Sequence, residues 1–303
     1  MTNTKNPGVV LAFGLTASLT IAALAGCAST TGETAAPEPD ATTSTVDDAL
    51  VALLPEDVRE RGTIIIGASL DYPPDNFLTS EDVPTGYMVD ILEAAADRVG
   101  LDIDYQRVDF ASVLTGIEAG RYDGGISFLD SVERQEVVNI VGVYGAAQAF
   151  LVRAGETLDG IPCGLPVGVG AGSIEETYLG YMSDDECVAK GLEPIQILTS
   201  PSNPQAQTAM ASGRVDAVFG SNAAAAWAVE ESDGAFEISG EPFRLTDSPL
   251  TGIAVAKDRL DIAEALQAII QSLMDDGTYA EILANWGVDG IGVETATLNG
   301  ATE

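Results

Sequence analysis

The feature that most restricts the fold of this sequence is a regular alternation of strand-like and helix-like segments. Residues 63–68 (TIIIGA) form a β-branched run that predicts a buried strand. Apolar residues then recur at helical spacing between residues 89 and 99 and stop at Gly100, a residue typical of a helix C-terminus. The pattern continues with a strand at 101–108, a helix at 111–118 and a strand at 123–128. Such an alternation favours a mainly parallel sheet with helices on both faces.

The alternation recurs in the second half of the chain. Further strands and helices are predicted at 165–169, 173–181, 195–198, 205–211, 215–219 and 223–230. A local self-similarity links the halves, because 117–124 (IEAGRYDG) and 210–217 (MASGRVDA) share a glycine, an arginine and an aspartate at the same spacing. Two similar α/β lobes would produce this match. Two more helices are predicted at 262–273 and 279–286, and residues 294–303 are expected to be frayed.

Residues 1–26 have the composition of a secretory signal peptide. Lys5 lies in a polar start, an apolar run covers residues 9–25, and small residues precede Cys27. The segment 24–27 (LAGC) resembles the lipobox of bacterial lipoproteins, which implies a lipid on Cys27 and anchoring to the outer face of the cell membrane. The alternative is an ordinary signal peptide with an incidental cysteine. Residues 27–55 are expected to form a flexible linker, because they begin with a long Thr-, Ser-, Ala- and Pro-rich stretch.

The composition excludes several classes of function. The chain has 13 Lys and Arg against 47 Asp and Glu, a formal net charge of −34, so nucleic acid is a poor partner. It contains no histidine, which removes histidine-based triads and histidine-ligated zinc. It also lacks the glycine-rich lysine motif of P-loops. We therefore expect no cofactor and no metal site, and we expect a monomer.

Two further cysteines, Cys163 and Cys187, lie in the part of the chain expected to fold outside the cell. An even pair in that compartment favours a disulfide. It would close a loop of about 25 residues and contribute on the order of 3 kcal/mol to stability. Two buried free thiols are the alternative.

Several short motifs follow one another along the chain. They are 67–74 (GASLDYPP), 86–92 (GYMVDIL), 119–123 (AGRYD), 133–135 (ERQ), 167–173 (VGVGAGS), 212–217 (SGRVDA), 252–255 (GIAV) and 276–279 (DGTY). In this order and spacing they resemble the family-3 extracellular solute-binding proteins of bacterial ABC importers. The resemblance implies two α/β lobes joined by two hinge strands, with a ligand clamped between them. Lobe 1 would comprise 56–145 plus 248–303, and lobe 2 would comprise 146–247.

The resemblance also implies a set of ligand contacts beyond the carboxyl ends of the strands, where open α/β sheets bind their ligands. Tyr72 would stack on the ligand, or would only pack near it. Arg134 matches the arginine that binds the ligand carboxylate with a forked pair of hydrogen bonds, unless it is a surface arginine in a helix ion pair. The other expected contacts are Ser69, Ser127, Phe128, Asp130, Gly172, Ser173 and Ser221.

The segment 170–176 (GAGSIEE) predicts a helix start that favours an anion. Ser173 and Glu176 have the spacing of a capping box. The free N–H groups of such a start attract an anion such as a carboxylate, although an ordinary cap without a ligand has the same sequence. Phe128 occupies a place where the family often has a small residue, and it would reshape the pocket.

One departure from the family concerns the acid that holds the ligand ammonium. Members that bind α-amino acids usually carry this acid where the present chain has Ser221, and often another where it has Ser69. A buried ammonium without a counter-charge is costly. Asp71, Asp130 or Glu175 would then replace the missing acid. If none does, the ligand is not a standard α-amino acid.

We therefore expect a lipid-anchored protein, not an enzyme, that captures a small polar solute such as an amino acid or an analogue for the membrane permease of an ABC importer. The same module could instead feed a sensor or receptor. A dehydratase-like enzyme on this fold is a further alternative, with only Asp, Glu, Lys or Tyr available as a base. A purely structural surface lipoprotein would show no ligand-induced change.

Overall fold

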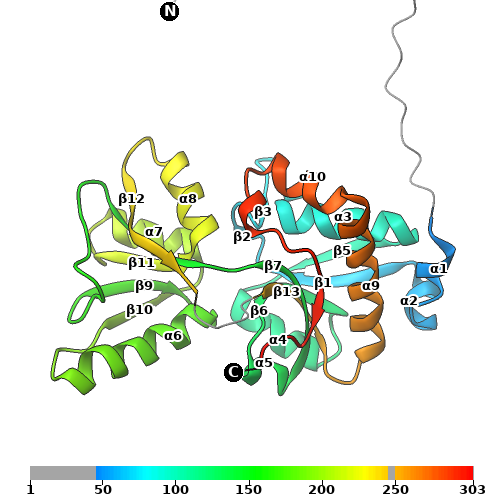
Figure 1. Ribbon diagram of the computed structural model, residues 1–303, viewed down its shortest axis with the longest axis horizontal. Coiled ribbons are helices and arrows are strands. Elements are labelled where there is room, and N and C mark those ends of the chain that lie inside the picture. The colour runs from blue at the N-terminus through cyan, green and yellow to red at the C-terminus, as the bar shows by residue number, and fades with distance from the viewer. Residues whose placement is uncertain (1–45, 245–249, 303) are drawn as a thin grey trace, which may run out of the picture. The chain divides into compact units, whose positions relative to one another are not determined.

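The computed structural model describes residues 46–244 and 250–302. The predicted signal peptide, Cys27 and the linker up to residue 45 lie outside the described residues. The described residues form two mixed sheets with helices packed on them, which make two α/β lobes (Figure 1). Within this part of the chain, no helix is long and apolar enough to cross a bilayer.

Lobe 1 is built on a six-stranded sheet. Its strands are β1 (Thr63–Ala68), β5 (Asp102–Arg107), β6 (Gly124–Leu129), β7 (Val138–Gly145), β13 (Leu250–Ala256) and β14 (Thr297–Leu298). They lie in the order β14-β7-β13-β6-β1-β5. A small separate sheet consists of β2 (Asp71–Tyr72), β3 (Asn76–Leu78) and β4 (Pro84–Thr85).

The longer helices of lobe 1 bury apolar residues, namely α3 (Tyr87–Val99), α4 (Phe110–Glu118), α9 (Leu260–Asp276) and α10 (Thr278–Asn285). The short α5 (Val132–Gln135) has no buried residue. Ile91 and Leu92 of α3 and Ile269 and Leu273 of α9 are almost inaccessible to solvent and belong to one core cluster. Burial of each such side chain contributes about 1.5–3 kcal/mol before opposing terms. Gly100 ends α3 at a φ of 67°, the left-handed conformation that glycine adopts without strain.

Lobe 2 is built on a five-stranded sheet whose three central strands are mostly buried and whose two edge strands are more exposed. Its strands are β8 (Gln148–Arg153), β9 (Pro166–Gly170), β10 (Gln196–Ser200), β11 (Ala217–Ser221) and β12 (Phe236–Phe243), in the order β10-β9-β11-β8-β12. Its helices are α6 (Ile174–Met182), α7 (Asn203–Ala211) and α8 (Asn222–Glu231). Leu151 enters one core cluster while its neighbours Phe150 and Val152 enter the other, as the alternation of a strand requires.

The sheets are mixed rather than mainly parallel, which corrects the expectation from the sequence. β1 pairs in parallel with β5 and β6, but β13 runs antiparallel to β6 and β7. In lobe 2, β8 runs antiparallel to β11 and β12. The reversed strands β8 and β13 each follow a crossing between the lobes, from β7 to β8 and from β12 to β13 (Figure 1). Residues 245–249 of the second crossing lie outside the described residues.

Two segments that were expected to be irregular are packed. The end of the predicted linker contains α1 (Asp48–Val51), where the Asp47 carboxylate accepts hydrogen bonds from the first free N–H groups. The Asp47 N–H also donates to the Arg98 carbonyl at 2.8 Å, and Leu54 is buried before α2 (Glu56–Arg61). Near the other end, β14 pairs with β7 and residues 299–301 continue along lobe 1.

The two cysteines of lobe 2 form the expected disulfide. The Cα atoms of Cys163 and Cys187 lie 5.6 Å apart, with a sequence separation of 24. Cys187 is buried with Leu179 and Ile195 in a core cluster of this lobe. The bond ties the segment before β9 to the single π-helical turn Ser183–Cys187 that follows α6.

Candidate functional site

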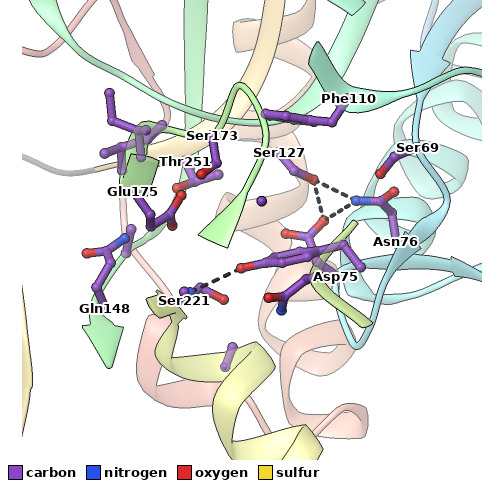
Figure 2. A pocket seen from close by; sticks show the side chains of 18 of the residues that line it. Ser69, Asp75, Asn76, Phe110, Ser127, Gln148, Ser173, Glu175, Ser221 and Thr251 are labelled. Carbon is purple, nitrogen blue, oxygen red and sulfur yellow. Dashed lines mark hydrogen bonds between the residues drawn. The ribbon is translucent and has the colours of Figure 1, made fainter. Parts of the chain in front are cut away.

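A pocket of about 1020 Å³, part of it open to solvent, is lined by both lobes. Its polar lining converges on one space (Figure 2). The polar side chains are Ser69, Asp71, Tyr72, Asp75, Asn76, Tyr87, Ser127, Arg134, Tyr144 and Thr251 of lobe 1 and Gln148, Ser173, Glu175, Ser202, Asn203, Ser221 and Asn222 of lobe 2.

The pocket lies at the carboxyl ends of parallel strands, as expected for open α/β sheets. Ser69 directly follows β1, and Ser127 lies in the parallel neighbour β6. In lobe 2, Ser173 follows β9 by a short turn, and Ser221 is the last residue of the parallel strand β11. Because these strands run in one direction within each sheet, their final residues meet at one edge.

Most of the predicted ligand contacts line this pocket. They are Ser69, Tyr72, Ser127, Arg134, Ser173 and Ser221. Phe128, Asp130 and Gly172 lie outside its lining. A contact with a ligand stays a prediction for the residues of the first group.

Phe128 and Asp130 lie outside the pocket lining and have partners within the protein, so a ligand contact of either residue stays a prediction that the pocket geometry does not support. The Phe128 ring is fully buried and stacks on Phe110, with ring centroids 4.7 Å apart. Asp130 Oδ2 accepts hydrogen bonds from the backbone N–H groups of residues 300 and 301 at 2.6 and 3.1 Å. Its Oδ1 accepts one from Gln135 Nε2 at 2.8 Å. Both oxygens of Asp130 therefore hold the protein's own chain.

Arg134 lines the pocket from α5 and donates hydrogen bonds to two backbone carbonyls. Nη1 donates to the Leu129 carbonyl at 3.1 Å, and Nη2 donates to the Gly172 carbonyl of lobe 2 at 3.5 Å. Among the described residues, no carboxylate forms an ion pair with it. Burial lowers the pKa of Arg134, while the charges of Glu175 and Glu133 act in the opposite direction. A partly desolvated guanidinium with spare donors is suited to a carboxylate.

The start of α6 forms the predicted capping box. The Ser173 hydroxyl accepts a hydrogen bond from the Glu176 N–H at 3.2 Å, and Glu176 Oε2 accepts one from the Gly172 N–H at 2.7 Å. The helix therefore satisfies part of its own start. Gly172 lies outside the pocket lining, but its backbone carbonyl accepts a hydrogen bond from Arg134 Nη2.

Tyr72 reaches from lobe 1 to lobe 2. Its hydroxyl accepts a hydrogen bond from the Ser221 N–H at 3.1 Å, which Figure 2 marks with a dashed line. Burial raises the pKa of Tyr72, and the charge of Glu175 raises it further. The Tyr72 hydroxyl therefore contacts the Ser221 backbone and lies within the electrostatic influence of the Glu175 carboxylate.

One buried carboxylate, that of Asp75, accepts hydrogen bonds from several polar side chains in the pocket wall. This cluster was not predicted from the sequence. Asp75 Oδ1 accepts hydrogen bonds from the Ser127 hydroxyl and from Asn76 Nδ2, the latter at 3.1 Å. Its Oδ2 accepts from the Tyr87 hydroxyl at 2.9 Å and from the Tyr144 hydroxyl. Burial raises the pKa of Asp75, and these donors oppose that rise. The cluster fixes Ser127, whose φ of 69° is unusual for a residue with a side chain.

Two of the acids proposed as replacements for the missing family acid do line the pocket. Asp71 and Glu175 belong to its wall, whereas Asp130 does not. Burial raises the pKa of Asp71, and a hydrogen bond with Ser69 and the charge of Arg107 oppose that rise. These acids do not gather into a metal site, since the described residues contain no cluster of three or more metal-ligating side chains.

Gln148 is a second lining residue that sequence reasoning missed. It opens β8 and is only 1% exposed. Its Oε1 has no hydrogen-bond partner within the described part of the chain. The sequence did not mark Gln148 as a lining residue. It lies next to the expected crossing between the lobes at residues 145 and 146, and a polar residue is not expected at a buried strand position.

The model of the family described as bacterial extracellular solute-binding proteins, family 3, matches residues 64–289. The chain belongs to this family. The assignment agrees with the two lobes and the pocket that they share, and it makes the protein a solute-binding protein rather than an enzyme.

Individual relatives extend the comparison. The arginine-binding protein ArgT of Corynebacterium glutamicum is 32% identical over 252 residues, which cover 82% of each chain. The L-cystine-binding protein TcyJ of Escherichia coli is 25% identical over 236 residues, 76% of this chain and 84% of that one. A solved ancestral arginine-binding protein bound to arginine has a TM-score of 0.66 and 26% identity, covering 75% of this chain and 98% of its own.

Proposed function

We propose that this protein binds a cationic L-amino acid of the arginine type between its lobes and delivers it to the permease of an ABC importer. The observation that carries the proposal is the charge pattern of the pocket. One guanidinium without an ion-pair partner among the described residues lies in the same wall as three acidic side chains, Asp71, Asp75 and Glu175.

Arg134 is the group proposed to bind the α-carboxylate. Its guanidinium already donates to two backbone carbonyls, and the remaining N–H groups offer a fork for two carboxylate oxygens. The start of α6, with Ser173 at its cap, adds a second favourable potential for an anion on the other lobe. A ligand carboxylate held by both would link the lobes.

The surplus of acids is what favours a cationic side chain. A neutral amino acid carries one charge of each sign, which Arg134 and a single acid would balance. Glu175 would be that acid, and the pocket lining holds a further one, Asp71, whereas both oxygens of Asp75 are already paired with donors of the protein. Burial raises the pKa of Asp71, so a bound cation near it would stabilise its ionised form. The relative ArgT is an arginine-binding protein, which agrees with this charge balance.

The aromatic rings of Tyr72 and Phe110 also line the pocket and suit the flat guanidinium of such a ligand. Phe110 is itself backed by Phe128, which stacks on it. The rings come from lobe 1, so we place the ligand side chain against that lobe.

The N-terminus supports a membrane-anchored protein. Residues 24–27 resemble a lipobox, and we propose that Cys27 carries the lipid. Replacing Cys27 with alanine should then move the protein from the membrane fraction to the medium or the soluble fraction, as measured by fractionation of expressing cells. Retention of the Cys27→Ala variant on the membrane would contradict the anchor. A sensing role in place of import would show as signalling without uptake of labelled ligand.

The ligand assignment is tested by thermal unfolding of the full chain in detergent, after denaturation and refolding to remove bound ligand. L-arginine at about 100 times its dissociation constant should add about 2.7 kcal/mol to the unfolding free energy. Arg134→Met should weaken binding about 100-fold, because charge-assisted hydrogen bonds are lost. The matched control is Arg121→Met, since Arg121 is exposed and outside the pocket lining. No response to any amino acid would refute the proposed function.

A further inference from the structure

Gln148 is the lining residue whose state in the structure is hardest to explain without a ligand. The side chain is 1% exposed, and its Oε1 has no partner within the described residues. Leaving a buried acceptor unpaired is unfavourable, and buried polar atoms in folded proteins are nearly always paired. The residue lines the pocket, so the missing partner belongs to what fills the pocket.

The surroundings of Gln148 indicate which kind of partner that is. Gln148 pairs with Ser221 across β8 and β11. The Ser221 N–H donates to the Tyr72 hydroxyl, and the same tyrosine is affected by the charge of Glu175. Figure 2 shows Gln148, Glu175 and Ser221 in the wall that lobe 2 contributes. An acceptor oxygen in the same wall as a carboxylate and a serine hydroxyl is suited to a cationic donor group.

We propose that Gln148 is a specificity-determining residue whose Oε1 accepts a hydrogen bond from the α-ammonium of the ligand, while Glu175 supplies the counter-charge. The inference rests on the proposed amino-acid function. Arg134, Gln148 and Glu175 line the same pocket, so one α-amino acid could present its carboxylate to the first and its ammonium to the other two. Ser221 itself carries no charge, and the counter-charge comes from α6 instead.

The test compares two probes and two variants. L-arginine carries the α-ammonium, and 5-guanidinopentanoate has the same guanidinium and carboxylate without it. Binding of both to the full chain in detergent is measured by calorimetry, for wild type and for Gln148→Met. We expect the variant to bind L-arginine about 10- to 100-fold more weakly, and 5-guanidinopentanoate within about twofold of wild type. Gln205→Met is the matched control, because Gln205 is exposed on α7 and outside the pocket lining.

The stability of the empty protein is the second readout. Because Gln148→Met removes an unpaired buried acceptor, the variant should unfold at the same temperature as wild type or higher in the absence of ligand. A merely structural glutamine would lower that temperature and weaken both probes equally, and either result would overturn the proposal. Equal affinity of wild type and Gln148→Met for L-arginine would also overturn it. If wild type binds no amino acid at all, the proposed function is wrong and this inference falls with it.

Discussion

Three aromatic rings join the lobes outside the polar lining of the pocket. Trp227 of lobe 2 lies against Phe77 and Trp286 of lobe 1, with ring centroids 5.9 and 6.3 Å apart. Phe77 and Trp286 also contact each other edge to face at 6.0 Å. The Trp286 indole is fixed by donating to Asp90 Oδ2 at 2.8 Å. Two rings of this cluster are therefore preassembled in lobe 1, and Trp227 completes it only when the lobes are together.

The Trp227→Ala variant should shift the protein away from this arrangement. Each aromatic pair is worth about 0.5–1.5 kcal/mol beyond its buried area, so the two pairs across the lobes contribute about 1–3 kcal/mol. A ligand bound between the lobes needs them together, and its apparent affinity falls with the fraction of protein in that state. We therefore expect the apparent Kd for L-arginine to rise by about 5- to 150-fold.

Calorimetric titration of the full chain measures this change. The two tryptophans of the chain are Trp227 and Trp286, so the emission of Trp286 in the variant should change less on ligand addition than the wild-type signal does. Tyr181→Phe is the control, because it removes only the exposed hydrogen bond between Tyr181 and Glu133 across the lobes. A Kd for Trp227→Ala within about twofold of wild type would refute the reasoning, because both ring pairs would then contribute nothing to lobe closure.

Three further outcomes are expected. Replacing Cys163 and Cys187 with alanine should lower the unfolding free energy by about 3.5 kcal/mol in denaturant titrations, from the loop that the bond closes; an unchanged midpoint would contradict this. Burial raises the pKa of Asp75, so its contribution to stability is present at low pH and lost as the pH rises through the folded pKa. The stability of Asp75→Asn relative to wild type should therefore improve as the pH rises above the ordinary pKa of an aspartate, and a constant difference would argue against it. Asp130→Ala should speed amide exchange at residues 300 and 301; unaltered exchange would show that the carboxylate does not hold this segment.

Helices and strands could be predicted from the sequence where apolar residues recur at a single spacing, either that of a helix or that of a strand. The apolar stripe between residues 89 and 99, with Gly100 at its end, predicted a helix there, and α3 spans Tyr87–Val99. Strand direction was not predictable in the same way. β7 and β8 are buried on both faces, so their composition is that of parallel strands although they pair antiparallel. Direction depends on the crossing between the lobes, which leaves no local pattern.

Long-range partners explain the remaining errors. Residues 294–303 are polar and rich in Thr and Gly, a composition that indicates fraying. In the folded chain the Asn299 side chain accepts from the Ile140 N–H and donates to Asn139, while Asp130 receives the next amides. Asp130 was proposed as a ligand contact because it directly follows a buried strand. The sequence does not distinguish an acid there that faces a pocket from one that binds a chain segment 170 residues away.

The net charge of the chain and the charge of its pocket act at different ranges, and only the second selects a ligand. A formal charge of −34 attracts any cation toward the surface. That attraction is screened over about 8 Å at physiological ionic strength, so it changes encounter rates more than it distinguishes one amino acid from another. Inside the pocket Arg134, Asp71 and Glu175 are partly shielded from water and come from both lobes. Under the proposed function, we therefore expect the order of charges on the ligand, rather than its net charge, to decide which amino acid binds.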